Sequence, residues 1–96
     1  MDKTLYLINL YDYYSDLLTD KQKQYFEDYY FQNLSLSEIS ENREISRNAI
    51  HKVIKETENK LNNYEKTLKL YTKSQKIKEI IKDLDEKTKN QIEELL

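Results

Sequence analysis

The chain contains no cysteine, no glycine and no proline, and Ala49 is its only alanine. Without glycine and proline it lacks the residues that usually mark hairpins and tight turns, which favours helices joined by short polar turns. Without cysteine it forms neither disulfides nor thiolate metal sites. Its only histidine, His51, has no carboxylate cluster at a spacing that would complete a zinc site. The sequence therefore predicts no metal and no cofactor.

Long apolar runs are also missing. No stretch approaches the roughly 18 apolar residues that a membrane-spanning helix needs. The charged residues Asp2 and Lys3, with no long apolar segment behind them, argue against a signal peptide. Glycine-rich phosphate loops are absent, and His51 has no acid or nucleophile at a recognisable catalytic spacing. We therefore expect a soluble, cytoplasmic, single-domain protein that is not an enzyme.

Positive charge is confined to one block. Residues 1–42 carry 3 lysines and 8 acidic residues, residues 43–82 carry 11 lysines or arginines and 5 acidic residues, and residues 83–96 carry 2 lysines and 5 acidic residues. The net charge of −2 thus conceals a segment of +6 between segments of −5 and −3. Such a block is either a localised anion-binding surface or a solvated helix face, and charge alone does not separate the two.

Apolar spacings of three and four residues predict a first helix over 3–18. Its apolar stripe is Leu7, Leu10, Tyr11, Tyr14, Leu17 and Leu18. Leu5 and Ile8 lie off this stripe, so we expect the helix to pack on two sides.

A capping box of Thr19 and Gln22 starts a second helix, over 20–32. One face of this helix is aromatic, with Tyr25, Phe26, Tyr29 and Tyr30. Aromatic side chains of this kind can stack on nucleic-acid bases. A stripe at helical spacing belongs more often to a protein core, and we favour that interpretation.

A helix-turn-helix is predicted over 35–55. Ser35 and Glu38 form a second capping box that opens a short helix over 36–42, and Ser46 caps the next helix after a turn of three or four residues. Its expected core residues are Leu36, Ile39, Ile45, Ile50 and Val53.

The turn of this unit departs from the usual pattern, because Glu44 stands where glycine is common. Glutamate would be strained in left-handed backbone. We therefore expect Asn42, which tolerates that conformation better, to adopt it instead. The angle at which the fourth helix leaves the turn stays open.

The helix after the turn carries its apolar and polar residues on opposite faces. At about 100° per residue, measured from Arg47, the apolar set falls between about 240° and 340° and the polar set between 0° and about 140°. Arginine pairs with guanine, asparagine with adenine and lysine with phosphate, and a helix N-terminus offers free N–H groups to a phosphate. We therefore predict a nucleic-acid-binding site made by Arg43, Ser46, Arg47, Asn48, His51, Lys52 and Lys55. A unit that only packs or binds protein is the alternative.

The same helix continues with the spacing of a coiled coil. The seam, which predicts a helix over 47–71, is Ile50, Ile54, Thr57, Leu61, Tyr64, Leu68 and Tyr71. Its last four residues extend past the core that the first 45 residues can build. Either the C-terminal helices fold back over them with Ile77, Ile80, Ile81 and Leu84, or a second copy covers Leu61, Tyr64, Leu68 and Tyr71 in a homodimer.

Two further helices complete the chain. Ser74 is expected to cap the first of them and Asp85 the second. We therefore divide the chain into a helix-turn-helix domain over 1–72 and a C-terminal helical extension over 73–96, which is not an independent domain. The predicted fold class is all-α.

With these residues the chain resembles the YlxM family, small bacterial helix-turn-helix proteins similar to region 4 of sigma factors. The residues that carry the resemblance are Leu17-Leu18-Thr19, Lys21-Gln22, Tyr25, Tyr29-Tyr30, Leu34-Ser35-Leu36, Glu38-Ile39, Ser46-Arg47, Ala49-Ile50 and Ile54-Lys55. Where the family tends to show tyrosine and aspartate, this chain has His51 and Lys52, which makes its recognition face more basic. The resemblance implies a sigma region 4-like fold and a gene neighbourhood shared with the signal recognition particle GTPases, from which a role in that targeting pathway is inferred.

Two functions stay open at this point. The first is a DNA-binding regulator whose fourth helix faces the groove. The second is an accessory or adaptor of the signal recognition particle that binds its RNA or protein components through the basic block or the aromatic helices. An enzyme is a distant third.

Overall fold

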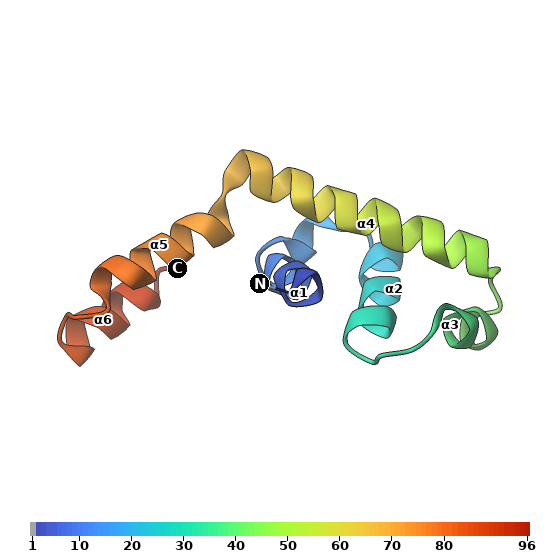
Figure 1. The fold of residues 1–96 in the computed structure, drawn as a ribbon, viewed down its shortest axis with the longest axis horizontal. Coiled ribbons are helices and arrows are strands. Elements are labelled where there is room, and N and C mark those ends of the chain that lie inside the picture. The colour runs from blue at the N-terminus through green and yellow to red at the C-terminus, as the bar shows by residue number, and fades with distance from the viewer. Residues whose placement is uncertain (1) are drawn as a thin grey trace.

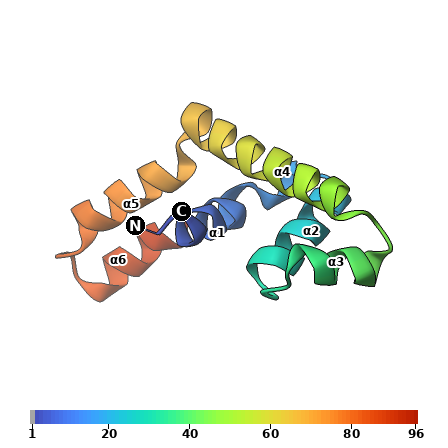
Figure 2. The same ribbon diagram turned by 45° about the vertical axis from the view of Figure 1, so that its right-hand side comes forward.

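Residues 2–96, the part of the chain that this computed structural model describes, contain six α-helices and one short 3-10 segment. They are α1 (Lys3–Tyr14), η1 (Ser15–Leu17), α2 (Asp20–Tyr30), α3 (Leu36–Arg43), α4 (Arg47–Leu68), α5 (Leu70–Ile81) and α6 (Glu86–Glu93). No strand occurs among the described residues, so the predicted all-α class is confirmed. The helices α1, α2 and α3 pack against α4, and α5 and α6 form a hairpin beyond its far end (Figures 1 and 2). Within residues 2–96 no helix combines the length and the hydropathy needed to cross a bilayer.

Side-chain caps set the starts of α2, α3 and α4. The predicted capping boxes of Thr19 with Gln22 and of Ser35 with Glu38 are present, each with two reciprocal hydrogen bonds of 3.0 and 3.1 Å. Ser46 caps α4, which begins at the predicted residue. Each cap satisfies a backbone N–H group that the helix leaves free and contributes about 1 kcal/mol. The starts of α2, α3 and α4 are thus encoded locally in the sequence.

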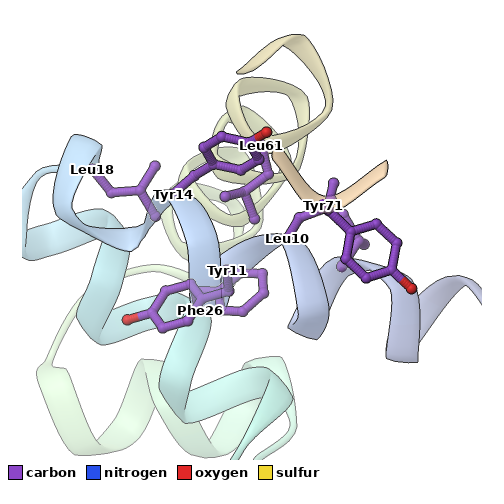
Figure 3. Close-up of a cluster of buried hydrophobic side chains, with 8 residues drawn as sticks. Leu10, Tyr11, Tyr14, Leu18, Phe26, Leu61 and Tyr71 are labelled. Carbon is purple, nitrogen blue, oxygen red and sulfur yellow. The ribbon is translucent and has the colours of Figure 1, made fainter. Parts of the chain in front are cut away.

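One core cluster joins α1, α2, α4 and α5. Its buried members are Leu7, Leu10, Tyr11, Tyr14, Leu18, Phe26, Leu61 and Tyr71 (Figure 3). The rings of Tyr11 and Phe26 stack with their centroids 4.6 Å apart and their planes 3° apart. The Tyr11 hydroxyl donates to Glu27 at 2.5 Å, which keeps the polar end of this buried ring satisfied. This cluster fixes α1 against the C-terminal half of α4.

A second core cluster joins the helix-turn-helix to α2. Its buried members are Tyr25, Ile39, Ile50 and Ile54, contributed by α2, α3 and α4. Leu36, Ile45 and Val53 pack at its edge. The predicted core of this unit is therefore confirmed.

The aromatic face of α2 belongs mainly to these two clusters. Tyr25 and Phe26 are 3% and 0% exposed, and Tyr30 is half-buried. The core interpretation of this face is confirmed for these residues. Tyr29 keeps 38% of its surface exposed and lies at the margin.

The first helix ends earlier than predicted. It stops at Tyr14, and η1 replaces the last turn of the helix expected over 3–18. A 3-10 turn rotates more per residue than an α-helix, so Leu17 is 50% exposed while Leu18 is buried. Leu5 is also 50% exposed, because no described element covers its side of α1. The predicted second packing side is wrong for that residue.

The turn of the helix-turn-helix places Glu44, and not Asn42, in left-handed backbone. Glu44 has φ 56° and ψ 42°, whereas Asn42 lies inside α3. The backbone N–H groups of Glu44 and Ile45 both donate to the Ser40 carbonyl, as in Schellman and αL caps. These bonds offset the roughly 1–2 kcal/mol cost of a non-glycine residue there. The prediction for Asn42 is wrong because α3 runs one residue further than expected.

The fourth helix ends at Leu68, before the predicted end at residue 71. Lys69 follows with φ 56° and ψ 32°, and α5 begins directly at Leu70. The chain therefore bends between α4 and α5 (Figure 1). The boundary predicted between 1–72 and 73–96 falls inside α5.

The last two helices are capped in different ways. Ser74 lies inside α5, where it is buried and bonded to the Tyr13 hydroxyl at 2.8 Å, so its predicted role as a cap is wrong. The N-terminus of α5 is capped instead by Glu65 of α4, whose carboxylate accepts two backbone N–H groups at 3.1 and 2.9 Å. Asp85 caps α6 as predicted, accepting a backbone N–H at 3.0 Å.

In the last part of the coiled-coil seam, Leu61 and Tyr71 are covered by α1, which is neither of the two predicted solutions. Leu61 and Tyr71 are 0% and 8% exposed, because both pack with α1. The α5–α6 hairpin leads away from α4 (Figure 2). Its Ile80 is 77% exposed. Tyr64 is half-buried and Leu68 is 42% exposed. A homodimer interface made by Leu61, Tyr64, Leu68 and Tyr71 is therefore wrong, since two of its residues lie inside the protomer.

Candidate nucleic-acid interface

Hydrogen bonds from Arg43 of α3 to α2 position the helix-turn-helix. The Arg43 Nε donates to Asp28 Oδ2 at 2.6 Å, and its Nη1 donates to Gln24 Oε1 at 3.2 Å. The guanidinium also lies 5.4 Å from the centroid of the Tyr25 ring. The hydrogen bond to Asp28 raises the pKa of Arg43 above its ordinary value. Arg43, predicted as a nucleic-acid-binding residue, is thus engaged between two helices and does not join the other predicted residues.

Four of the predicted residues meet around one hollow at the N-terminus of α4. Ser46, Arg47, Asn48 and His51 line it, with Leu36 of α3 on its edge, and its volume is about 430 Å³. The four polar residues are all exposed. Leu36 was predicted only as a core residue, and it is half-buried with part of its side chain at this hollow. No separate signal in the sequence marks it, because its spacing is that of the core.

The first turn of α4 also presents backbone donors. The first N–H groups of an α-helix have no partner within the helix. The Ser46 hydroxyl oxygen accepts the backbone N–H of Ala49 at 3.2 Å. The N–H groups of Arg47 and Asn48 keep no hydrogen-bond partner among the described residues. A positive helix end with free donors favours an anion at this place.

Lys52 and Lys55 continue the same exposed face along α4. Lys55 forms an ion pair of 3.2 Å with Glu58, which is 7% exposed and also accepts the Tyr30 hydroxyl. Burial and this hydrogen bond to Glu58 raise the pKa of Tyr30. Arg47 and Lys52 form no ion pair anywhere in residues 2–96. Their charges are therefore available to a ligand.

The opposite face of α4 is anchored in the protein. Ile50, Ile54 and Thr57 are at most 2% exposed, and the Thr57 hydroxyl donates to the Val53 carbonyl at 2.8 Å. The predicted separation of an apolar and a polar face is confirmed. Cationic and amide donors thus project from a rigid helix, an arrangement that suits phosphates and base edges. Among the described residues, no group of three His, Cys, Asp or Glu side chains is placed to hold a metal ion.

The whole chain, residues 1–96, matches the family model UPF0122, described as "Putative helix-turn-helix protein, YlxM / p13 like". It is similar to the UPF0122 protein YlxM of Bacillus subtilis, with 44% identity over 86 residues that cover 90% of this chain and 78% of that protein. The UPF0122 protein of Malacoplasma penetrans is 47% identical over 87 residues, covering 91% of this chain and 79% of that protein. The UPF0122 protein of Halalkalibacterium halodurans is 44% identical over 86 residues, covering 90% and 79%.

Proposed function

The chain belongs to the family of YlxM / p13-like helix-turn-helix proteins, and we propose that it is a regulatory protein that binds duplex DNA through the N-terminal half of α4. The observation that carries the proposal is the exposed donor face of α4. Its residues are Ser46, Arg47, Asn48, His51, Lys52 and Lys55. Access to chromosomal DNA requires that the protein reside in the cytoplasm.

Each donor has a place in such a complex. The N-terminal residues of a recognition helix contact base edges in the major groove. Arg47 suits guanine O6 and N7, and Asn48 suits adenine. Lys52 and Lys55 neutralise phosphates, and the first-turn N–H groups donate hydrogen bonds to a phosphate. About four to six phosphate contacts give a slope of log affinity against log salt near −4 to −5.

Duplex RNA is the less suitable ligand for this face. The major groove of A-form RNA is deep and narrow, and side chains on a helix cannot read it. The RNA of the signal recognition particle, a partner implied by the sequence resemblance, is therefore the comparison ligand in the test. Preferential binding of that RNA by the same face would support the adaptor role instead.

The test is fluorescence anisotropy with genomic duplex DNA and with the particle RNA, each over a series of salt concentrations. The variant Arg47→Ala/Lys52→Ala should weaken DNA binding by about 1–3 kcal/mol in total. The control, Lys78→Ala/Lys87→Ala, removes the same charge from exposed positions on α5 and α6. Unchanged affinity of the Arg47/Lys52 variant for every DNA and RNA that the wild type binds would refute the proposal.

A further inference from the structure

Most of the basic block lies outside the helix-turn-helix. Only 4 of the 11 basic residues of the segment 43–82 fall within 35–55. The other basic residues follow on α4 and α5, and they are Lys60, Lys66, Lys69, Lys73, Lys76, Lys78 and Lys82. Lys60 and Lys82 are engaged with Gln22 and Glu79 at 3.2 and 2.7 Å. The proposed function does not use this charge.

Three of these lysines surround a second hollow, at the bend between α4 and α5. This hollow has a volume of about 510 Å³, and the lysines that line it are Lys66, Lys69 and Lys76. The other lining residues are Tyr6, Asn62, Glu65 and Thr72. The three lysines are exposed, and none of them forms an ion pair in the part of the chain that the structure describes.

The bend itself brings these lysines together. In an uninterrupted helix, Lys66 and Lys76 would lie about 15 Å apart along the axis. The left-handed Lys69 turns α5 away from the axis of α4, so that residues of both helices line one hollow. We call this lysine cluster at the bend, Lys66, Lys69 and Lys76, the corner cluster.

A buried hydrogen-bond network holds the corner in place. The Glu65 carboxylate accepts the Tyr14 hydroxyl at 2.6 Å and the Tyr71 backbone N–H at 3.1 Å. It also accepts the backbone N–H and the hydroxyl of Thr72 at 2.9 and 2.5 Å. The Tyr14 hydroxyl in turn accepts the Leu70 N–H at 3.0 Å. The corner is therefore a preorganised part of the fold.

Glu65 does not neutralise the corner cluster by pairing with it. Burial alone would raise the pKa of Glu65, but the hydrogen bonds from Thr72, Tyr14 and Tyr71 hold it below its ordinary value. The carboxylate is charged at neutral pH, and its oxygens are occupied by these donors. Three lysines against one carboxylate leave the hollow with a net positive charge.

The outer face of α4 connects the two hollows. At about 100° per residue, positions 59, 62 and 66 fall within the arc bounded by His51 and Lys52. These positions are Asn59, Asn62 and Lys66, all exposed hydrogen-bond donors. Lys66 lies roughly 21 Å along α4 from Lys52, the length of about six base pairs.

We propose that the corner cluster is a second phosphate-binding surface, which holds the nucleic-acid backbone beyond the segment contacted by the N-terminus of α4. This inference rests on the proposed function. Lysine acts on phosphate as a point charge and reads no base, so this surface adds affinity and length to the target but no sequence specificity. A duplex that engages both hollows must extend along α4 or bend toward it.

The test compares two duplexes with the same central sequence, which the helix-turn-helix contacts. The short one, of about 10 base pairs, extends about five base pairs to either side of that contact and ends before the corner cluster, whereas the long one has about 30 base pairs. The corner variant is Lys66→Gln/Lys69→Gln/Lys76→Gln. The control variant, Lys3→Gln/Lys78→Gln/Lys87→Gln, removes equal charge from other exposed positions. Circular dichroism of both variants is the check that they fold.

For the long duplex, the corner variant should lower the magnitude of the salt slope by about 2–3 and reduce affinity about tenfold to a hundredfold. For the short duplex it should match the control. Equal losses for both lengths, or a corner variant that matches the control on both, would overturn the inference. If the corner variant matches the control on both duplexes while Arg47→Ala/Lys52→Ala still weakens binding, only this inference fails. If the wild type binds neither duplex, the proposed function fails with it.

Discussion

Replacing Tyr14 by phenylalanine keeps the ring but removes one hydroxyl from the hydrogen-bond network around Glu65 at the bend between α4 and α5. Tyr14 is 0% exposed, and its hydroxyl bonds to Glu65 and to the Leu70 N–H at 2.6 and 3.0 Å. A hydrogen bond to a charged group contributes about 1.5–3 kcal/mol, and an orphaned N–H costs about 1–3 kcal/mol when buried. Because the Leu70 N–H is only partly buried and Glu65 keeps its other donors, we expect the free energy of unfolding to fall by about 2–4 kcal/mol.

Urea denaturation followed by far-ultraviolet circular dichroism measures this loss. The control is Tyr29→Phe, because Tyr29 is 38% exposed and its hydroxyl makes no hydrogen bond within residues 2–96. That control should stay within about 0.5 kcal/mol of the wild type. If Tyr14→Phe cost no more than Tyr29→Phe, the hydrogen bonds of the Tyr14 hydroxyl would not hold the bend between α4 and α5.

Ile50→Ala should lower the free energy of unfolding by about 2–5 kcal/mol, because it opens a cavity where three helices meet, whereas Ser35→Ala should cost about 1 kcal/mol through its lost cap. Denaturant melts that reversed this order would contradict the placement of the core. The lowered pKa of Glu65 means that its stabilisation is present above its unfolded pKa of about 4.3 and is lost as pH falls through the folded pKa. An acid titration of stability should show this loss in the wild type but not in Glu65→Gln. Burial and the hydrogen bond to Glu65 raise the pKa of Tyr14 to about 12. The stabilisation that the Tyr14 hydroxyl gives the folded state should therefore be lost as pH rises from its unfolded pKa of about 10 through that value. Tyrosinate absorbance of Tyr14→Phe should lack one late-ionising group, and an unchanged titration would argue against this assignment.

The features of the helix-turn-helix that were predictable from the sequence depend on neighbouring residues. Ser35, Glu38 and Ser46 form their caps within three residues, and local bonds of this kind are visible in a sequence. The faces of α4 follow from helical periodicity alone, since the residues that must be buried and those that must be exposed repeat every turn. The donor face of α4 could therefore be predicted before its surroundings were known.

The features that were missed depend on contacts between distant residues. Arg43 was expected to face a ligand because its partner, Asp28, lies 15 positions away on another helix. The end of α4 was misplaced because Lys69 gives no local sign of left-handed backbone, and the bend is held by Tyr14, 51 positions before Glu65. The corner cluster depends on that bend, so no spacing in the sequence reveals it.

Whether α4 is the DNA-binding helix is tested by titrating the isotope-labelled protein with duplex DNA and following the amide chemical shifts in two-dimensional NMR. The donor face predicts that the largest shifts occur at residues 46–55, at the turn and the first half of α4. The amides of α6 (Glu86–Glu93) serve as the internal reference and should not move. Shifts confined to α5 and α6, or none at DNA concentrations that saturate the anisotropy signal, would contradict the assignment of α4 as the DNA-binding helix.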